Sequence, residues 1–292
     1  MTDRFEKTFM IDFNLHQVPA AVGLEVGSDT GAAILGISKA AFEAHVGEVN
    51  AGVRNIAKRL LENPDLVRAL ENLDLMDTGT MMTVGDSITT YRWGYASILK
   101  AMLELHQPER QLRFLNVGQS GYTSTHGKEL TFTQLLTQKP DLVTIKFGAN
   151  DSKHFGAPNE PSLVSQVEYR ENLDAMVRGF QRHTKAKIVL LSPTPVIESV
   201  VNSSPAYESM HMTWDNTDIR AFGATLKDMA QQRGLGFVDL YSIFGDTPNP
   251  NLYLEDGLHP SPAGHELILS TLLLRLERSQ MEAGETDEIK HL

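Results

Sequence analysis

The stretch Thr80–Thr90, TMMTVGDSITT, decides how most of the chain folds. Its apolar run over 81–84 is long enough for one buried strand, and a helical pattern begins at Ile88. Between them, Gly85–Ser87 places a serine at a strand-to-helix turn, a recurring way to present a nucleophilic hydroxyl. Asp and Ser are also common helix caps, so this stretch alone leaves a capping role and a catalytic role open.

Composition limits the classes of function that the chain can have. The chain has 292 residues, 41% of them hydrophobic, which suits one large domain, and it has no cysteine for disulfides, thiolate catalysis or metal binding. Its formal net charge of −11 argues against nucleic-acid and anionic membrane partners. The sequence shows neither a membrane-spanning run nor a secretory signal. We expect a cytoplasmic protein that acts on a small molecule.

After residue 80 the pattern alternates between strands and helices, which indicates a parallel sheet covered by helices on both faces. Strands are expected at Met81–Val84, Leu112–Val117, Leu142–Phe147, Ile188–Leu191 and Phe237–Leu240. Helices are expected at Ile88–Leu105, Lys128–Thr137, Leu163–His183, Thr217–Arg233 and Pro262–Leu276. The predicted fold is a three-layer α/β/α, flavodoxin-like doubly wound sheet with strand order 2-1-3-4-5.

The regions flanking this alternation have a different character. Residues 80–278 form the predicted main domain, residues 1–79 a mainly helical N-terminal extension, and residues 279–292 a polar, mobile tail. Within the extension, helical spacing starts at Ser38 and stops at Asn63, which can cap a second helix over Asp65–Leu73.

The part of the extension before Ser38 is rich in glycine and is expected to be a loop with a short strand around Phe9–Phe13. The apolar stripe of the extension suggests three roles: covering the domain edge, shaping the substrate entrance, or pairing subunits in a homo-oligomer.

In such a sheet, ligands bind beyond the carboxyl ends of the strands. The segments that follow the predicted strands are Gly85–Ser87, Gly118–Gly121, Gly148–Asp151 and, after a longer loop, Asp256–Pro260. Together they contain a serine, glycines, an asparagine, a histidine and an aspartate. Acyl transfer needs such a set, because it requires a nucleophile, a base, a group that orients the base, and oxyanion donors.

The blocks GDS (Gly85–Ser87), NVGQSG (Asn116–Gly121), GAND (Gly148–Asp151) and DGLHP (Asp256–Pro260) resemble those of the SGNH/GDSL hydrolases in order and spacing. The resemblance covers roughly residues 80–270, a typical single-domain size. Each block alone is a weak signal, whereas four blocks in register are strong evidence.

The resemblance implies a role for each matching residue. Ser87 is the expected nucleophile, His259 the general base, and Asp256 the carboxylate that orients the imidazole. The expected oxyanion hole consists of the backbone N–H groups of Ser87 and Gly121 and the side-chain amide of Asn150. The family implies no cofactor and no metal.

Other polar residues of these segments have a structural interpretation. Asp86 and Asp151 are expected to hold their loops through backbone hydrogen bonds, and His265 is expected to be structural on the last helix. His126, His154 and His211 lack the spacing of metal ligands, so no metal site is predicted.

The substrate is less well specified. Tyr122, His154 and Trp214 are candidate substrate-binding residues, and the connection Pro193–Asn216 is either a lid or a loop packed on the sheet. The leading interpretation is a serine ester hydrolase that cleaves short-acyl or acetyl esters through an acyl-serine intermediate. The alternatives are an acyltransferase that acts on a sugar or alcohol acceptor, and a non-catalytic sugar- or ester-binding module.

Overall fold

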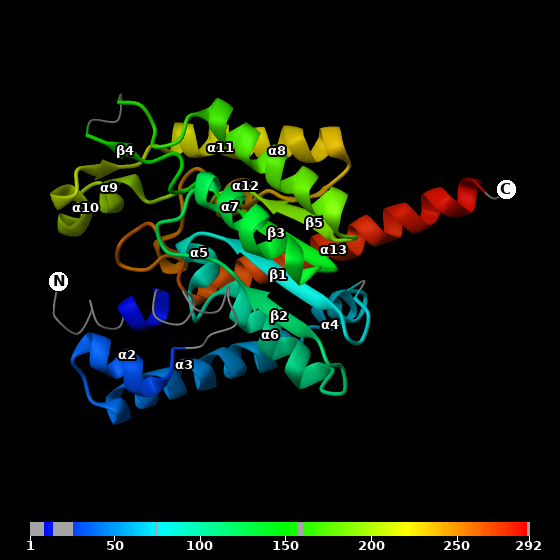
Figure 1. The fold of residues 1–292 in the computed structure, drawn as a ribbon, viewed down its shortest axis with the longest axis horizontal. Helices are drawn as coiled ribbons and strands as arrows, with labels where there is room; N and C mark the ends of the chain where they lie inside the picture. The colour runs from blue at the N-terminus through cyan, green and yellow to red at the C-terminus, as the bar shows by residue number, and fades with distance from the viewer. Residues whose placement is uncertain (1–8, 14–25, 74, 157–159, 291–292) are drawn as a thin grey trace.

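A parallel sheet forms the centre of the computed structural model, which describes residues 9–13, 26–73, 75–156 and 160–290, with backbone only for 278–290 (Figure 1). The sheet consists of β1 (Thr80–Gly85), β2 (Arg113–Asn116), β3 (Leu142–Lys146), β5 (Lys187–Leu191) and β7 (Gly236–Val238). Its five strands are parallel and lie in the order β2-β1-β3-β5-β7. Numbered by their position along the chain, these strands have the order 2-1-3-4-5, which confirms the predicted fold.

Alternate residues of each central strand enter two different hydrophobic cores. Met81 and Leu142 pack in the first core with α6 (Tyr95–His106) and α13 (Pro262–Lys290). Met82 and Val143 pack in the second core, whose helices are α7 (Ser124–Leu130), α8 (Gln166–His183) and α11 (Asn216–Arg233). Successive strand side chains point to opposite faces, so the apolar runs of these strands fit a sheet buried on both sides.

The helix predicted over Ile88–Leu105 is interrupted in the structure. A single turn, α5 (Ser87–Thr90), is followed by a break, and α6 then starts after Gly94. A Cβ on Gly94 would lie 2.7 Å from the carbonyl oxygen of Tyr91, so the close turn requires glycine at this position. The apolar periodicity continues across the break, which explains why the sequence predicts one helix.

The helix predicted over Lys128–Thr137 also differs from the observed one. It begins earlier, because Thr123 and His126 form a capping box at the start of α7. It then changes its pitch through η2 (Thr131–Leu135), a π-helical turn, and η3 (Leu136–Gln138), a 3-10 turn.

The N-terminal extension is helical and packs on the main domain. α3 (Lys39–Leu60) starts at the predicted Ser38 cap and lies against α6, and α4 (Pro64–Glu71), capped by Asn63, lies against α13. The contact of α3 is close, since a Cβ on Gly52 would lie 2.2 Å from the ring of Trp93. The apolar stripe of α3 is therefore covered within one chain, and homo-oligomer formation stays a prediction.

Two expectations for the early part of the extension are wrong over the described residues; residues 14–25 of the predicted loop lie outside these. The glycine-rich segment contains α2 (Ser28–Leu35), in which Gly31 leaves room for the ring of Phe42, 2.6 Å from where a Cβ would lie. Residues 9–13 form a helical turn rather than a strand.

Short elements complete the described part of the chain. They are β4 (His154–Phe155), α9 (Glu198–Val201), α10 (Pro205–Ser209), β6 (Met212–Thr213), α12 (Leu240–Phe244) and η4 (Pro250–Leu252). β4 and β6 pair as a two-stranded antiparallel sheet.

The last helix is longer than the predicted Pro262–Leu276. α13 continues to Lys290 and projects from the body of the molecule (Figure 1), so residues 279–290 are helical in the structure. The mobility expected of this tail stays a prediction. No helix in the described ranges is long and apolar enough to cross a membrane.

Candidate active site

In the turn after β1, one residue caps the following helix and the next residue lies against a histidine. Asp86 is the N-cap of α5, and its Oδ1 accepts a hydrogen bond of 3.0 Å from the N–H of Ile88. Ser87, the first residue of that helix, has its hydroxyl 2.8 Å from Nε2 of His259. The two roles left open by the sequence thus fall on neighbouring residues.

The turn after η4 brings His259 and its carboxylate partner together. Gly257 adopts a φ of 69°, a left-handed conformation that favours glycine, and so Asp256 turns back toward the histidine. Oδ2 of Asp256 lies 2.5 Å from Nδ1 of His259, and its Oδ1 accepts the N–H groups of Leu258 and His259, each at 3.0 Å. The structure therefore brings together the three residues predicted as a triad.

The electrostatic surroundings keep Asp256 ionised. Burial disfavours its charge, but His259 and the two backbone N–H donors outweigh burial and lower the pKa of Asp256 to about 2. The hydroxyl of Tyr207 donates a further hydrogen bond of 3.1 Å to Oδ2. The sequence had suggested Tyr207 only as part of a possible lid, because nothing in its neighbourhood predicts contact with a residue 49 positions away.

Two of the three predicted oxyanion donors, Gly121 and Asn150, lie on loops that the buried Asp151 holds in place. Asp151 accepts the N–H groups of Ser124 at 2.8 Å and Gly148 at 3.1 Å, as expected of a loop-holding residue. Burial raises its pKa to about 6. Asn150, 7% exposed, donates from Nδ2 to the carbonyl oxygen of Tyr122 at 3.0 Å, so this bond fixes the orientation of its amide. Gly121 adopts a φ of 80°.

Two of the three predicted substrate-binding residues, Trp214 and His154, are buried and bonded to protein groups. Trp214 is 2% exposed and donates from Nε1 to the carbonyl oxygen of Ala149 at 2.7 Å. His154 is 4% exposed, contacts the carbonyl of Glu160 through Nδ1, and lies 2.8 Å from Asp218 through Nε2. Both rings therefore support the loops, and substrate contact by either residue stays a prediction.

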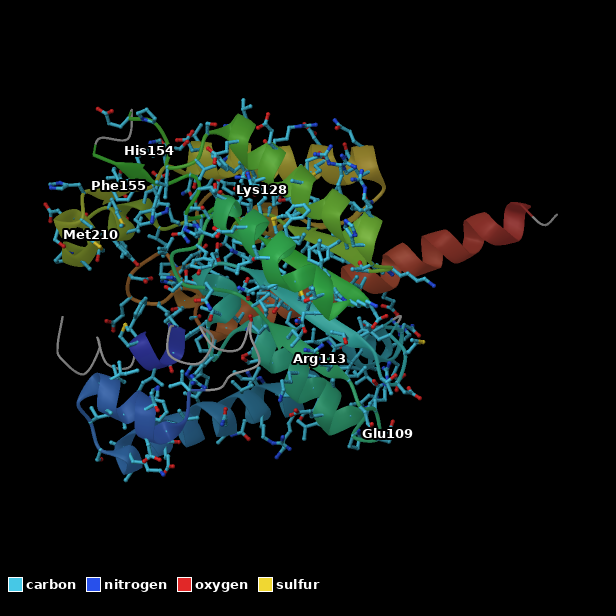
Figure 2. The ribbon with its side chains drawn as sticks, in the orientation of Figure 1. Glu109, Arg113, Lys128, His154, Phe155 and Met210 are labelled. Carbon is cyan, nitrogen blue, oxygen red and sulfur yellow. The ribbon has the colours of Figure 1, made fainter. Side chains whose placement is uncertain are left out.

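The third predicted substrate-binding residue, Tyr122, keeps a partly exposed side chain, which stacks on His126 at 4.6 Å. In Figure 2, His154, Phe155 and Met210 lie together over β4 and α10. Phe155 and Met210 are exposed on that surface, at 47% and 46%.

Sequence reasoning missed a cluster of buried titratable side chains next to the nucleophile. Lys146, at the end of β3, is fully buried, and its Nζ lies 3.5 Å from Oδ1 of Asp86. Burial lowers the pKa of Lys146. His265, also fully buried, accepts the N–H of Tyr95 at Nδ1, and burial together with the charge of Lys146 lowers its pKa to about 3. A lysine inside an apolar strand was the available signal for this cluster, and His265 is structural as predicted.

A second group that sequence reasoning missed comes from the N-terminal extension. The rings of Phe9 and Phe13 lie 5.8 Å and 4.8 Å from the imidazole of His259, measured between centroids. More than 240 positions separate these phenylalanines from His259 in the sequence, and no local pattern predicts such a contact.

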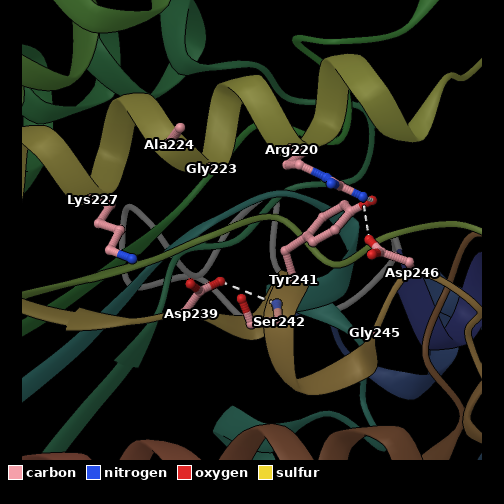
Figure 3. Close-up of a pocket in the computed structure, with 9 residues that line it drawn as sticks. All are labelled: Arg220, Gly223, Ala224, Lys227, Asp239, Tyr241, Ser242, Gly245 and Asp246. Atoms are coloured by element: carbon pink, nitrogen blue, oxygen red, sulfur yellow. Dashed lines mark hydrogen bonds and ion pairs between the residues drawn. The ribbon is translucent and has the colours of Figure 1, made fainter.

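A pocket of about 400 Å³ between α11 and α12 is not part of this site (Figure 3). Among its charged groups, Arg220 pairs with Asp246, and Asp239 accepts the N–H of Ser242 at 3.1 Å. Among the residues that the structure describes, no group of three or more His, Cys, Asp or Glu side chains could hold a metal ion.

The chain is similar in sequence to known esterases. The chain is 29% identical over 210 residues to the human isoamyl acetate-hydrolyzing esterase 1 homolog, covering 68% of this chain and 81% of the relative. It is 28% identical over 191 residues to acetylxylan esterase of Geobacillus stearothermophilus, covering 62% of this chain and 80% of that protein.

The crystal structure of an acetylxylan esterase from the same bacterium superposes with a TM-score of 0.55 and 26% identity, covering 69% of this chain and 96% of that one. The model of the GDSL-like lipase/acylhydrolase family matches residues 83–267, more than half of the chain. The chain therefore belongs to the GDSL-like lipase/acylhydrolase family and is an enzyme of the carboxylic ester hydrolase class.

Proposed function

We propose that this enzyme cleaves short-acyl esters through an acyl-serine intermediate formed on Ser87. The observation that carries the proposal is the continuous chain of contacts from Oγ of Ser87 through both nitrogens of His259 to Oδ2 of Asp256. A serine hydroxyl is a weak nucleophile unless a neighbouring base accepts its proton, and this arrangement supplies such a base together with a carboxylate that orients it.

In the first half of the reaction, Oγ of Ser87 attacks the ester carbonyl carbon while Nε2 of His259 takes the hydroxyl proton. The carbonyl oxygen gains negative charge. We propose that the N–H groups of Ser87 and Gly121 and the amide of Asn150 stabilise this charge by hydrogen bonds. The intermediate then collapses, and the alcohol leaves with the proton from Nε2.

In the second half, His259 takes a proton from water, and the resulting hydroxide attacks the acyl-serine. Collapse of this intermediate releases the carboxylic acid and returns the proton to Ser87. The ionised Asp256 stabilises the imidazolium that forms in both halves.

The burial of the reacting groups supports a small acyl group. Ser87, Asn150 and His259 are 7%, 7% and 4% exposed, so little of their surface is accessible to an ester. The names of the two relatives, an isoamyl acetate-hydrolyzing esterase homolog and an acetylxylan esterase, both concern acetyl esters. We therefore propose acetyl esters as the first substrates to test.

The setting in which the enzyme acts is a separate proposal. We propose that it works in the cytoplasm on small esters, supported by its lack of cysteine and its net charge of −11.

The decisive experiment is intact-protein mass spectrometry after exposure to a fluorophosphonate, followed by peptide mapping. We expect a single adduct on Ser87, no adduct in Ser87→Ala, and loss of p-nitrophenyl acetate turnover in that variant. Unchanged turnover by a folded Ser87→Ala protein would refute the mechanism. Acetate release measured with and without an alcohol or sugar acceptor separates hydrolysis from acyl transfer.

A further inference from the structure

We propose that Phe9 and Phe13 of the N-terminal extension form the subsite for an apolar alcohol part of the ester. The proposal rests on the function proposed above and adds to it the substrate group that these rings select. It gives the extension, which precedes the family-matched residues 83–267, a direct part in specificity.

The two rings form a continuous aromatic wall beside the proposed general base. Phe9 and Phe13 are four residues apart on one helical turn, so they share a face, and their rings stack at 4.5 Å. Phe13 also stacks on Tyr91 at 4.4 Å with only 6° between the ring planes, and it lies 4.8 Å from His259. Because Tyr91 directly follows α5, the wall spans from the helix that carries Ser87 to the imidazole of His259.

Protein contacts hold this helical turn in position. The N–H of Arg92 donates to the carbonyl of Asp12 at 3.0 Å, and its Nε donates to the carbonyl of Ile11 at 2.9 Å. The carboxylate of Asp12 lies 2.8 Å from Nε2 of His45 on α3. The side chain of Ile11, two positions from each phenylalanine, packs in a separate cluster with α2 and α3. The turn is thus attached to both the main domain and the extension.

The chemistry of the reaction tells which part of the substrate meets the wall. The leaving alcohol oxygen receives its proton from Nε2 of His259, so the alcohol is the part of the ester next to the imidazole. The rings that lie against this imidazole are those of Phe9 and Phe13. Phe13 is 3% exposed and forms the inner part of the wall, while Phe9 is only partly buried and offers the accessible surface. Phenyl rings offer apolar contact and no hydrogen-bonding side-chain atom, which favours an alkyl or aryl alcohol.

The test uses methyl, butyl and hexyl acetate. These esters form the same acetyl-Ser87 intermediate and differ only in the alcohol. Wild-type kcat/KM is expected to rise from methyl to hexyl acetate. In Phe9→Ala, the hexyl-to-methyl ratio is expected to fall about tenfold, since truncating an apolar contact typically changes discrimination by about 10–200-fold. The rate of deacylation, measured by rapid-quench mass spectrometry of acetyl-Ser87, is expected to stay the same because the alcohol has already left.

Ile11→Val is the matched control, because it trims a buried side chain of the same turn that packs away from His259 and keeps its apolar contact with α2 and α3. We expect it to keep the wild-type preference among the three acetates. An unchanged hexyl-to-methyl ratio in active Phe9→Ala refutes the alcohol subsite. An equal fall of kcat/KM for all three esters, together with slower deacylation, refutes the alcohol subsite as well. Phe9 would then act by positioning His259.

The outcomes also separate the two proposals. If the wild-type enzyme hydrolyses acetates without forming acetyl-Ser87, the proposed mechanism is wrong. If acetyl-Ser87 forms and Phe9→Ala leaves the alcohol preference intact, only the subsite is wrong. A second variant, Phe13→Leu, keeps an apolar side chain at the buried position and is expected to lower the same ratio, by a smaller factor than Phe9→Ala.

Discussion

Two clusters of polar side chains meet at the neighbouring residues Asp86 and Ser87, and they differ in how their charges are satisfied. In the relay, defined as Ser87, His259 and Asp256, each reacting polar atom has a partner within 3.0 Å. In the buried cluster, defined as Asp86, Lys146 and His265, three atoms of the described structure have no hydrogen-bond partner: Oδ2 of Asp86, Nζ of Lys146 and Nε2 of His265.

The difference indicates that hydrogen-bond and charge partners, and not burial alone, decide the ionisation of buried side chains in the two clusters. Asp256 is largely buried, yet its hydrogen bonds and the charge of His259 lower its pKa to about 2. For Lys146 and His265 burial dominates and lowers the pKa of each, while the carboxylate of Asp86, 3.5 Å from Nζ, opposes the shift of Lys146. We therefore expect changes in the relay to affect catalysis and changes in the buried cluster to affect stability.

The largest expected effect is on catalysis, from His259→Ala. Loss of the base should lower kcat for p-nitrophenyl acetate by about 10⁶-fold, because the hydroxyl of Ser87 loses its proton acceptor. Steady-state kinetics and urea denaturation of the same preparation measure both properties. If His259→Ala lowered the free energy of unfolding and kept the wild-type kcat, the relay would not be the cluster that affects catalysis.

Asp256→Asn should lower kcat by about 10⁴-fold while leaving the fold intact, because an amide does not hold the same imidazole tautomer or stabilise the imidazolium. The matched control is Asp218→Asn, since Asp218 pairs with His154 outside the relay. Its kcat is expected to remain close to that of the wild type. Similar losses in both variants would indicate that any histidine–carboxylate pair in this region affects the rate equally.

Lys146→Met should lower the free energy of unfolding by about 3–5 kcal/mol, because it leaves the carboxylate of Asp86 buried without its cation. In the double variant Lys146→Met/Asp86→Asn, most of this loss should be recovered, since the asparagine can still cap α5 and carries no charge. Urea denaturation at neutral pH measures both variants. Additive losses in the double variant would show that the two charges do not interact.

The smallest expected effect is the acid dependence of stability from Asp256. Its pKa is lowered from 3.8 to about 2 in the folded chain, so it stabilises the fold above pH 4 and loses this contribution as the pH falls from about 4 to about 2. The contribution is about 2 kcal/mol. The difference in unfolding free energy between wild type and Asp256→Asn should shrink across this range; a constant difference would contradict it.

The contribution of Asp151 to stability should depend on pH in the opposite direction from that of Asp256. Its pKa is raised from 3.8 to about 6, so its ionisation reduces stability as the pH rises from about 4 to about 6.

The sequence by itself determined the sheet, its strand order and the residues that follow each strand. These features depend on local patterns: apolar runs of strand length, helical periodicity between them, and polar blocks at the ends of strands. The order and spacing of the four blocks resemble those of the SGNH/GDSL hydrolases, and this resemblance predicted Ser87, Asp256 and His259 as the triad. The three residues lie together in the structure, as expected of segments at one edge of a parallel sheet.

Only the tertiary structure decided which side chains surround these residues. Phe9 and Phe13 reach His259, Tyr207 reaches Asp256 and Lys146 reaches Asp86 through contacts between distant or neighbouring elements that leave no periodic signal. The same holds for the ring nitrogens of Trp214 and His154, which bond to Ala149 and Asp218 on other segments. The period of a pattern reports which face of an element is buried, whereas the identity of the neighbour depends on how distant elements pack.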